Sequence, residues 1–599
     1  MEISGVQPNP LELAPDCLSG AQNGTANPEG GATAGLAGAS AGAGDTVNFS
    51  PEALQLSAAT TGIAPLSSML DFMTATKATG EVGSDVVNVT SAGVVTWAGT
   101  KLDLSNLGFS NFIIQADSTG TGFNVYNSAN PTGASVKLDS KGKQVADPVT
   151  DPYVATDDSL VVLRNEDFTG TSGGGMIVNL AANAGKSISG GTGSATIFNF
   201  AGSVTSLSAS TGTDGGNIFT RGLSAGTINV GNGRTTDGVD NATLVVLGNM
   251  TGVNINTNGD VFIDAYFYAL NNVTITAAAT TPASFTRIHA KKIAYGEITL
   301  GNGYNAVVVT GNMTDTTVIG GTDTDYVYIN GKSIRNIIEL DDGDDILDIR
   351  GAVKDTTITY TGGDNTTSAK SGNGVTYTSS STGNDAVRFY GAVTNSTFDL
   401  GAGANTFTAQ AVNKQYVDTA VKNLTGVTIT ASGTDPDKDY TIIKANVLKS
   451  TKTKESSIKL LGAGENEVNL KSIAGNKTKG VTIDLGYDRT GASTSAKTQT
   501  LDVKGGVKFL DFKSGDGDAI LIINGSISNS FFDLGDGDNT FTAVKKNRQG
   551  QDKGQKLTNV GITAASTSNT EVTFGRLLSG KKQDPPAEWA GISKINLVV

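Results

Sequence analysis

The sequence predicts an all-β fold, dominated by a parallel β-solenoid (a β-roll or a β-helix) with about 20 residues per coil. Composition is the first reason: 77 of 599 residues are glycine, while 17% are charged and 6% aromatic. Such a chain is typical of many short strands joined by glycine turns. The second reason is a regular spacing of polar turn residues, and the third is the apolar alternation between those turns.

The regular spacing is clearest in the middle of the chain. Strand-like alternations such as "AVVVT" and "YVYIN" lie between the turns, and a second set includes "TTVIG" and "NIIEL". Each unit therefore contains two predicted strands and two turns. So short a unit cannot bury its own apolar face, so neighbouring coils must stack into one continuous core. The polar column that defines the spacing comprises Asn305, Asp325, Asp345, Asn365, Asp385 and Asn405.

Composition also divides the chain into segments. A Gly/Ala-rich start favours a flexible arm, and the "SPEALQL" stretch after it favours a short helix. Lysine-rich stretches later in the chain interrupt the repeat and favour irregular structure. The predicted segments are 1–46 (flexible arm), 47–80 (short helical segment), 81–150 (small β domain or solenoid cap), 151–408 (solenoid), 409–460 (irregular lysine-rich insertion) and 461–599 (solenoid continuation with a C-terminal cap or secretion signal).

Charge and hydropathy exclude several classes of protein. The formal net charge of −14 disfavours nucleic acid and anionic membranes as partners. No stretch approaches the roughly 20 apolar residues of a membrane-spanning helix. The start "MEISGVQPNPLELAPDCLSG" lacks the basic and apolar regions of a Sec signal peptide. If the protein is exported, we therefore expect a route without an N-terminal Sec signal.

Cysteine and histidine are almost absent. The single cysteine, Cys17, excludes an internal disulfide framework. The single histidine, His289, excludes histidine-rich zinc sites, and a Ser-His-Asp site would depend on it alone. We expect a structural role for His289.

The acidic turns are the candidate functional sites. Stacked coils lie about 4.8 Å apart, so equivalent turn residues form ladders along the solenoid. Asparagine ladders are favourable because amides both donate and accept, whereas two carboxylates at that distance repel by roughly 1 kcal/mol in water. Bound Ca²⁺ would relieve the repulsion, since it takes six to eight oxygen ligands; alternatively, glycine and Asx residues simply satisfy turn geometry. The candidate metal ligands are Asp323, Asp325, Asp342, Asp344, Asp345, Asp364, Asp516, Asp518, Asp536 and Asp538.

These turns carry a family resemblance. The segments "DDGDDIL", "GTDTDYV", "GAGANTF" and "GDGDNTF" are similar to the second half of the G-G-x-G-x-D-x-U-x nonapeptide of RTX (repeats-in-toxin) proteins. The resemblance implies Ca²⁺ bound between coils of a β-roll and export by type I machinery. The longer repeat, the frequent asparagine in place of aspartate and the single Gly-x-Gly turn per coil depart from the family pattern.

Composition over the whole chain also resembles bacterial surface-layer proteins and large secreted adhesins. The leading hypothesis is a structural, self-assembling extracellular protein of a bacterial cell surface, stabilised by Ca²⁺ and not an enzyme. Its expected partners are further copies of itself, in a lateral homo-oligomer or lattice, and cell-surface polysaccharide or lipopolysaccharide.

Two alternatives come from other classes. An adhesin or fibre-type glycan-binding protein would carry one non-repeating aromatic patch, for which "VFIDAYFYAL" at 261–270 is the best candidate. A β-helical polysaccharide lyase or hydrolase would use paired carboxylates. The recurrence of the aspartates with the structural period disfavours catalysis, because a catalytic site interrupts a repeat once.

Overall fold

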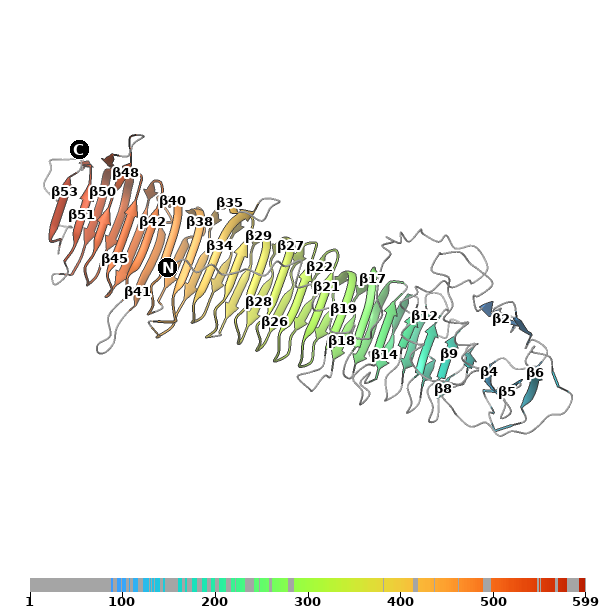
Figure 1. The fold of residues 1–599 in the computed structure, drawn as a ribbon. Coiled ribbons are helices and arrows are strands. Elements are labelled where there is room, and N and C mark those ends of the chain that lie inside the picture. The colour runs from blue at the N-terminus through green and yellow to red at the C-terminus, as the bar shows by residue number, and fades with distance from the viewer. Residues whose placement is uncertain are drawn as a thin grey trace.

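The computed structural model is an elongated stack of short strands, most of them parallel (Figure 1). The described residues form strands and turns and contain no α-helix, which confirms the predicted all-β solenoid. The predicted arm (1–46) and helical segment (47–80) lie outside the described residues. The structure describes strands and short adjoining stretches from residue 88 to 277, then 285–578 with gaps at 381, 413–417, 436, 462, 488–496, 547–548, 550 and 566–568, and finally 592–597.

Antiparallel strands precede the stack in the region predicted to be a small β domain or cap. Strands β1 (Asn88–Val89), β2 (Val94–Trp97) and β3 (Thr100–Asp103) form one antiparallel sheet. A second antiparallel group contains β4 (Phe112–Ala116), β5 (Gly122–Asn127) and β6 (Val136–Asp139). Strand β7 (Leu160–Leu163) joins this group to the solenoid, because it pairs antiparallel with β4 and parallel with β9 (Gly175–Asn179).

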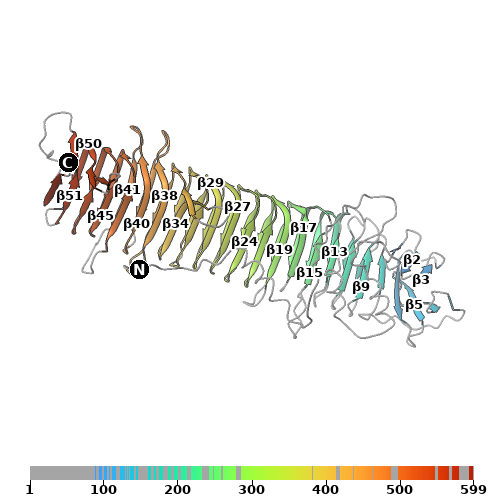
Figure 2. The ribbon, with the colours of Figure 1, turned by 45° about the horizontal axis from the view of Figure 1, so that its top comes forward.

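A coil contains two main strands and one short corner strand. One coil has β21 (Asn305–Val309), β22 (Met313–Thr314) and β23 (Thr317–Ile319). The next has β24 (Asp325–Ile329), β25 (Ser333–Ile334) and β26 (Ile337–Leu340). The coils pair strand by strand in parallel, with Asn305 opposite Asp325 and Thr317 opposite Ile337. The turned view in Figure 2 follows this stacking along the rod. The corner strand is the element that the sequence pattern did not reveal.

The solenoid continues through the predicted insertion at 409–460. Strand β34 (Asn405–Val412) extends outward into an antiparallel hairpin with β35 (Asp418–Val421). The chain then returns to the stack, where β38 (Thr441–Lys449) pairs in parallel with β34. A second antiparallel hairpin, β48 (Val544–Lys546) with β49 (Asp552–Gly554), lies near the C-terminal end. Most of the described part of 409–460 therefore forms regular coil strands in place of the expected irregular insertion, and the hairpins are local departures from coils that keep their parallel pairing.

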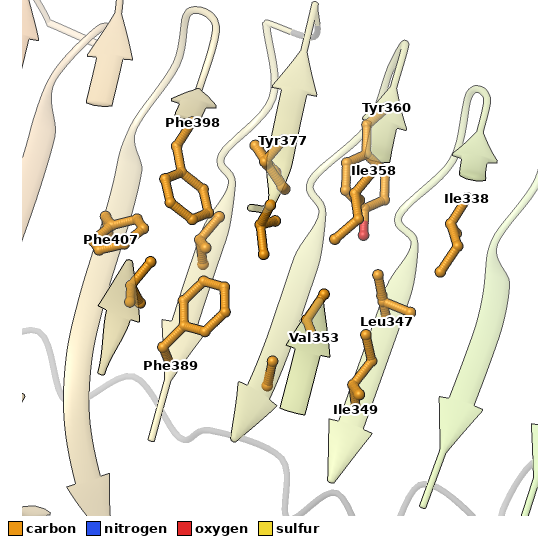
Figure 3. Packing of buried hydrophobic residues seen from close by; sticks show 14 of the residues in the cluster. Ile338, Leu347, Ile349, Val353, Ile358, Tyr360, Tyr377, Phe389, Phe398 and Phe407 are labelled. Atoms are coloured by element: carbon orange, nitrogen blue, oxygen red, sulfur yellow. The ribbon is translucent and has the colours of Figure 1, made fainter. Parts of the chain in front are cut away.

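The core is a column of side chains from alternate strand positions. Val307, Val327 and Leu347 occupy equivalent positions in successive coils and are fully buried. Figure 3 shows aromatic rings that fill the interior further along, including Phe398 and Phe407, whose ring centroids are 4.8 Å apart in an edge-on arrangement. Because each side chain packs on the coils before and after it, burial is continuous along the stack.

Glycine is required at one corner by the close approach of neighbouring coils. Gly363 has a φ of +72°, and a Cβ atom there would lie 1.7 Å from the carbonyl oxygen of Gly343. A Cβ on Gly383, one coil later, would lie 1.9 Å from the Gly363 oxygen. This contact explains the glycine that precedes the Asx column by two positions.

Phe531 and Phe532 are adjacent in β46 (Ile527–Asp533) and give a matched test of core packing. Phe532 is fully buried against Phe512 and Phe541, whereas Phe531 is 40% exposed. We expect Phe532→Ala to lower the free energy of unfolding by about 3–5 kcal/mol, because it leaves a cavity in a continuous core. Phe531→Ala should cost about 1 kcal/mol or less. Urea denaturation followed by circular dichroism measures both; equal losses would contradict the assigned alternation.

Candidate functional site

The candidate site is the corner where the acidic turns meet the strands. Side chains of the Asx column point into the solenoid and form what we call the inner ladder. Its members are buried and each accepts a hydrogen bond from the coil before it. The described inner ladder runs through Asn305, Asp325, Asp345, Asn365, Asp385, Asn405, Asn466 and Asn539.

Hydrogen bonds along the inner ladder replace those that a corner cannot supply from its backbone. The Asp325 N–H donates to Asp345 Oδ1 at 2.8 Å, and the Asp345 N–H donates to Asn365 Oδ1 at 3.2 Å. Where an asparagine is present, its amide adds a second bond: Asn305 Nδ2 donates to Asp325 Oδ1 at 2.9 Å. The inner ladder therefore satisfies buried donors that would otherwise destabilise the stack.

Burial changes the ionisation of the ladder aspartates. It raises the pKa of Asp345 to about 7, and the neighbouring charges of Asp325, Asp344 and Asp341 act in the same direction. Burial also raises the pKa of Asp325, to about 6, against the lowering effect of the hydrogen bond from Asn305. Asp345 Oδ2 is buried without a hydrogen-bond partner among the described residues. These carboxyls therefore take up protons near neutral pH unless a cation compensates their charge.

Other turn aspartates lie at the surface and form an outer row. The Asp364 N–H donates to Asp344 Oδ1 at 2.8 Å, and the Asn384 N–H donates to Asp364 Oδ1 at 2.7 Å. The outer row thus accepts bonds from the following coil, whereas the inner ladder accepts them from the preceding coil. Together they connect each acidic turn to both of its neighbours.

The ten predicted ligands differ in how deeply they are buried. Asp325 and Asp345 belong to the buried inner ladder. Asp323 is half-buried and accepts the Gly303 N–H at 3.1 Å. The remaining ligands of the first cluster are exposed in the turns, namely Asp342, Asp344 and Asp364.

The second acidic cluster repeats the outer-row geometry. The Asp538 N–H donates to Asp518 Oδ1 at 2.7 Å, one coil apart. Asp516 and Asp536 are exposed beside them. The buried positions of this corner hold neutral residues, Ala519 and Asn539, so the second cluster lacks the buried carboxyls of the first.

No group of three or more His, Cys, Asp or Glu side chains that could hold a metal ion occurs among the residues that the structure describes. The acidic side chains of these corners do not converge on one point, because ladder carboxylates point inward and turn carboxylates point outward. Calcium binding at these turns stays a prediction.

A second polar ladder, at another corner of the coil, was not predicted. The Thr316 N–H donates to Asn336 Oδ1 at 2.9 Å, and the Leu510 N–H donates to Ser530 Oγ at 3.1 Å. The residue that precedes a member of this second ladder in the chain takes the left-handed conformation, as Arg335 does before Asn336, with a φ of 53°. The pattern in the sequence that would have indicated it is the recurrence of Thr, Asn or Ser at positions 316, 336, 356 and 396.

The non-repeating segment 261–270 forms most of β17 (Val261–Asn271), which pairs with β19 (Thr286–Ala294) through a register shift between Ala265 and Ala269. As expected, half of it is core: Val261 and Ile263 are fully buried. Phe262 lies on the outer face near His289, with ring centroids 5.7 Å apart. Burial and the charge of Arg287 lower the pKa of His289.

Comparisons with known proteins give no assignment: no family model, curated protein or solved structure matches this chain. In the parts of the chain that the structure describes, no helix has the length and apolar character needed to cross a membrane.

The raised pKa of Asp345 predicts a pH-dependent stability. The pKa of this carboxyl is 3.8 in its usual state and about 7 in the native protein. Between these two pH values the native state therefore binds more of the proton than the unfolded state does. Stability from this group is therefore lost as the pH rises across that window and is constant above it. Asp345→Asn keeps the Oδ1 acceptor without the charge, so we expect a gain of about 2 kcal/mol in unfolding free energy at pH 8, and almost none near pH 4.

Urea denaturation at both pH values, in the presence of a chelator, measures this difference. The control is Asp342→Asn, which makes the same substitution at an exposed turn carboxylate and should alter stability little at either pH. A loss of stability in Asp345→Asn at pH 8 would show that the buried carboxylate is needed in its charged form.

Proposed function

We propose that this protein is a structural, self-assembling extracellular protein of a bacterial cell surface, of the surface-layer type, stabilised by calcium. The observation that carries the proposal is the regularity of the stack. Buried apolar residues and polar corner ladders recur from coil to coil, as expected for a rod-shaped structural protein. A catalytic site would instead interrupt the repeat at one place. Export by a type I-like route belongs to the same proposal.

Calcium would act on the acidic turns. The first cluster places Asp342, Asp344 and Asp364 at the surface of adjacent turns, beside the ladder carboxyls whose pKa is raised by burial. A cation with oxygen ligands would neutralise the outward-facing turn carboxylates and so weaken their repulsion of the ladder carboxyls, by bridging turns within one chain or between copies. Because calcium is abundant outside cells, ordering of the coils would follow export.

Assembly would use the sides of the rod. The solenoid carries long sheet faces along its length (Figure 1), and repeated coils offer the same surface many times. Lateral contacts between copies would therefore be weak for each coil and strong in sum. The expectation that the protein is not an enzyme is part of this proposal, and loss of a depolymerising activity on replacement of one non-periodic carboxylate would overturn it.

Electron microscopy of the purified full chain tests the assembly. We expect sheets or filaments in millimolar calcium and dispersed particles after addition of a chelator. A protein that stays monodisperse and equally heat-stable in both conditions would contradict the proposal.

A paired variant tests where calcium acts. We expect calcium to raise the melting temperature of the parent chain on the order of 5 °C. Asp342→Asn with Asp344→Asn should remove most of this rise, because it deletes two turn ligands. Glu339→Gln with Asp399→Asn removes two charges from exposed sheet positions and should keep the rise. An equal response in the two double variants would exclude the turns as the calcium site.

A further inference from the structure

We infer that copies of this protein associate side by side, with a lysine-rich edge of one solenoid against an acidic edge of its neighbour. The inference rests on the proposed self-assembly and names the two surfaces that meet in it. The surface that we call the lysine edge comprises Lys449, Lys452, Lys454, Lys471, Lys477 and Lys479. The surface that we call the acidic edge comprises the exposed turn residues Glu465, Asp516 and Asp538.

Two corner loops with the same Lys-Thr-Lys pattern build most of the lysine edge. Loop 450–455 precedes β39 (Ser456–Leu460), and loop 475–480 precedes β41 (Val481–Tyr487). Because β39 pairs in parallel with β41, the two loops lie on successive coils. The other two lysines of the edge lie in β38 and β40 (Glu467–Ala474), the strands that lead into these loops.

Hydrogen bonds hold the two loops in place. The Lys454 N–H donates to Thr451 Oγ1 at 2.7 Å in the first loop. The Lys479 N–H donates to Asn476 Oδ1 at 3.0 Å in the second loop. Asn476 Nδ2 also donates to the Thr451 carbonyl oxygen at 2.8 Å and joins the loops. The lysines are therefore held on adjacent coils, where their positive charges repel one another.

Little negative charge balances the lysine edge within one copy. Its six lysines form no ion pair among the residues that the structure describes. Glu455 is the single acidic residue of the two loops, and its Oε1 accepts the Thr482 hydroxyl at 2.6 Å. Residues 401–599 contain 25 lysines and arginines against 20 aspartates and glutamates, whereas residues 1–400 contain 18 against 37. The lysine edge therefore favours an anionic partner.

The acidic edge lies at the opposite ends of the same strands. Strand β39 begins at the first lysine loop and ends before the turn that carries Glu465. Its five residues span about 16 Å, so Glu465 is too far from the lysine edge to pair with it in the same copy. Asp516 and Asp538 lie in equivalent turns of later coils. These three side chains are exposed and make no hydrogen bond or ion pair within the described part of the chain.

A second copy of the chain supplies the charge that each edge lacks. Coils are stacked about 4.8 Å apart along both edges, so a copy placed alongside brings several carboxylates to several lysines. Unlike edges attract and like edges repel, which selects this contact over the alternatives. Because the two edges differ, the contact is heterologous and can continue from copy to copy in an open row. Calcium is proposed at the first acidic cluster, so the two interactions use different turns.

Charge reversal of each edge in the full chain, with the variants tested alone and mixed, examines this contact. The lysine-edge variant combines Lys452→Glu, Lys471→Glu and Lys477→Glu. The acidic-edge variant combines Glu465→Lys, Asp516→Lys and Asp538→Lys. We expect each variant alone to associate at least tenfold more weakly than the parent chain in millimolar calcium, because like charges then face each other. An equimolar mixture should recover association, because the two reversed edges complement each other.

Sedimentation velocity and electron microscopy measure association, and unchanged circular dichroism and melting temperature verify folding. The matched control reverses three exposed lysines on the outer sheet faces and should associate like the parent; it combines Lys444→Glu, Lys459→Glu and Lys513→Glu. Association of the parent should also weaken as salt rises.

The outcomes separate this inference from the proposed function. A parent chain that stays monodisperse at low salt overturns both. A parent that assembles, with edge variants that assemble equally well alone, overturns the edge contact and leaves the proposed self-assembly standing. Normal assembly of the lysine-edge variant together with lost binding to phosphatidylglycerol vesicles would assign the lysine edge to an anionic lipid surface and overturn the inference.

Discussion

Hydrogen bonding from one coil to the next is the interaction on which the rest of this structure depends. A coil of about 20 residues has no core of its own, so its strands exist only because the coils before and after supply backbone partners. Between strands this pairing is ordinary parallel-sheet bonding. At the corners the backbone turns away, and side chains of the inner ladder accept the N–H groups that would lose their partners. The ladder thus allows strand pairing to continue around each corner.

The acidic residues take two roles because of this geometry. A carboxylate in the inner ladder is a hydrogen-bond acceptor in a buried place, where its charge is costly and its pKa is raised. A carboxylate in the outer row accepts a similar bond while it faces solvent. Asparagine can replace aspartate in the ladder because its oxygen serves equally, and its amide adds a donor. The mixture of the two residues along the column follows from this shared function.

The periodic and non-periodic parts of the surface differ in what they can do. The acidic turns and the polar corner ladders recur from coil to coil, which suits the proposed assembly. The bulge in β17 interrupts the repeat and adds aromatic rings beside basic side chains. A rod of repeated coils tolerates such an interruption because each coil contacts only its neighbours.

The sequence by itself determined the fold class, the coil length and the corner glycines. These features recur with the period of the stack, so a single chain reveals them without any partner residue. It also identified Asx residues as corner ladders and the 261–270 segment as half core. Only the tertiary structure decided that Asp325 and Asp345 point inward while Asp344 and Asp364 remain at the surface. That choice depends on where each strand begins relative to the adjacent coil, and neighbouring coils fix it through hydrogen bonds that no local pattern encodes.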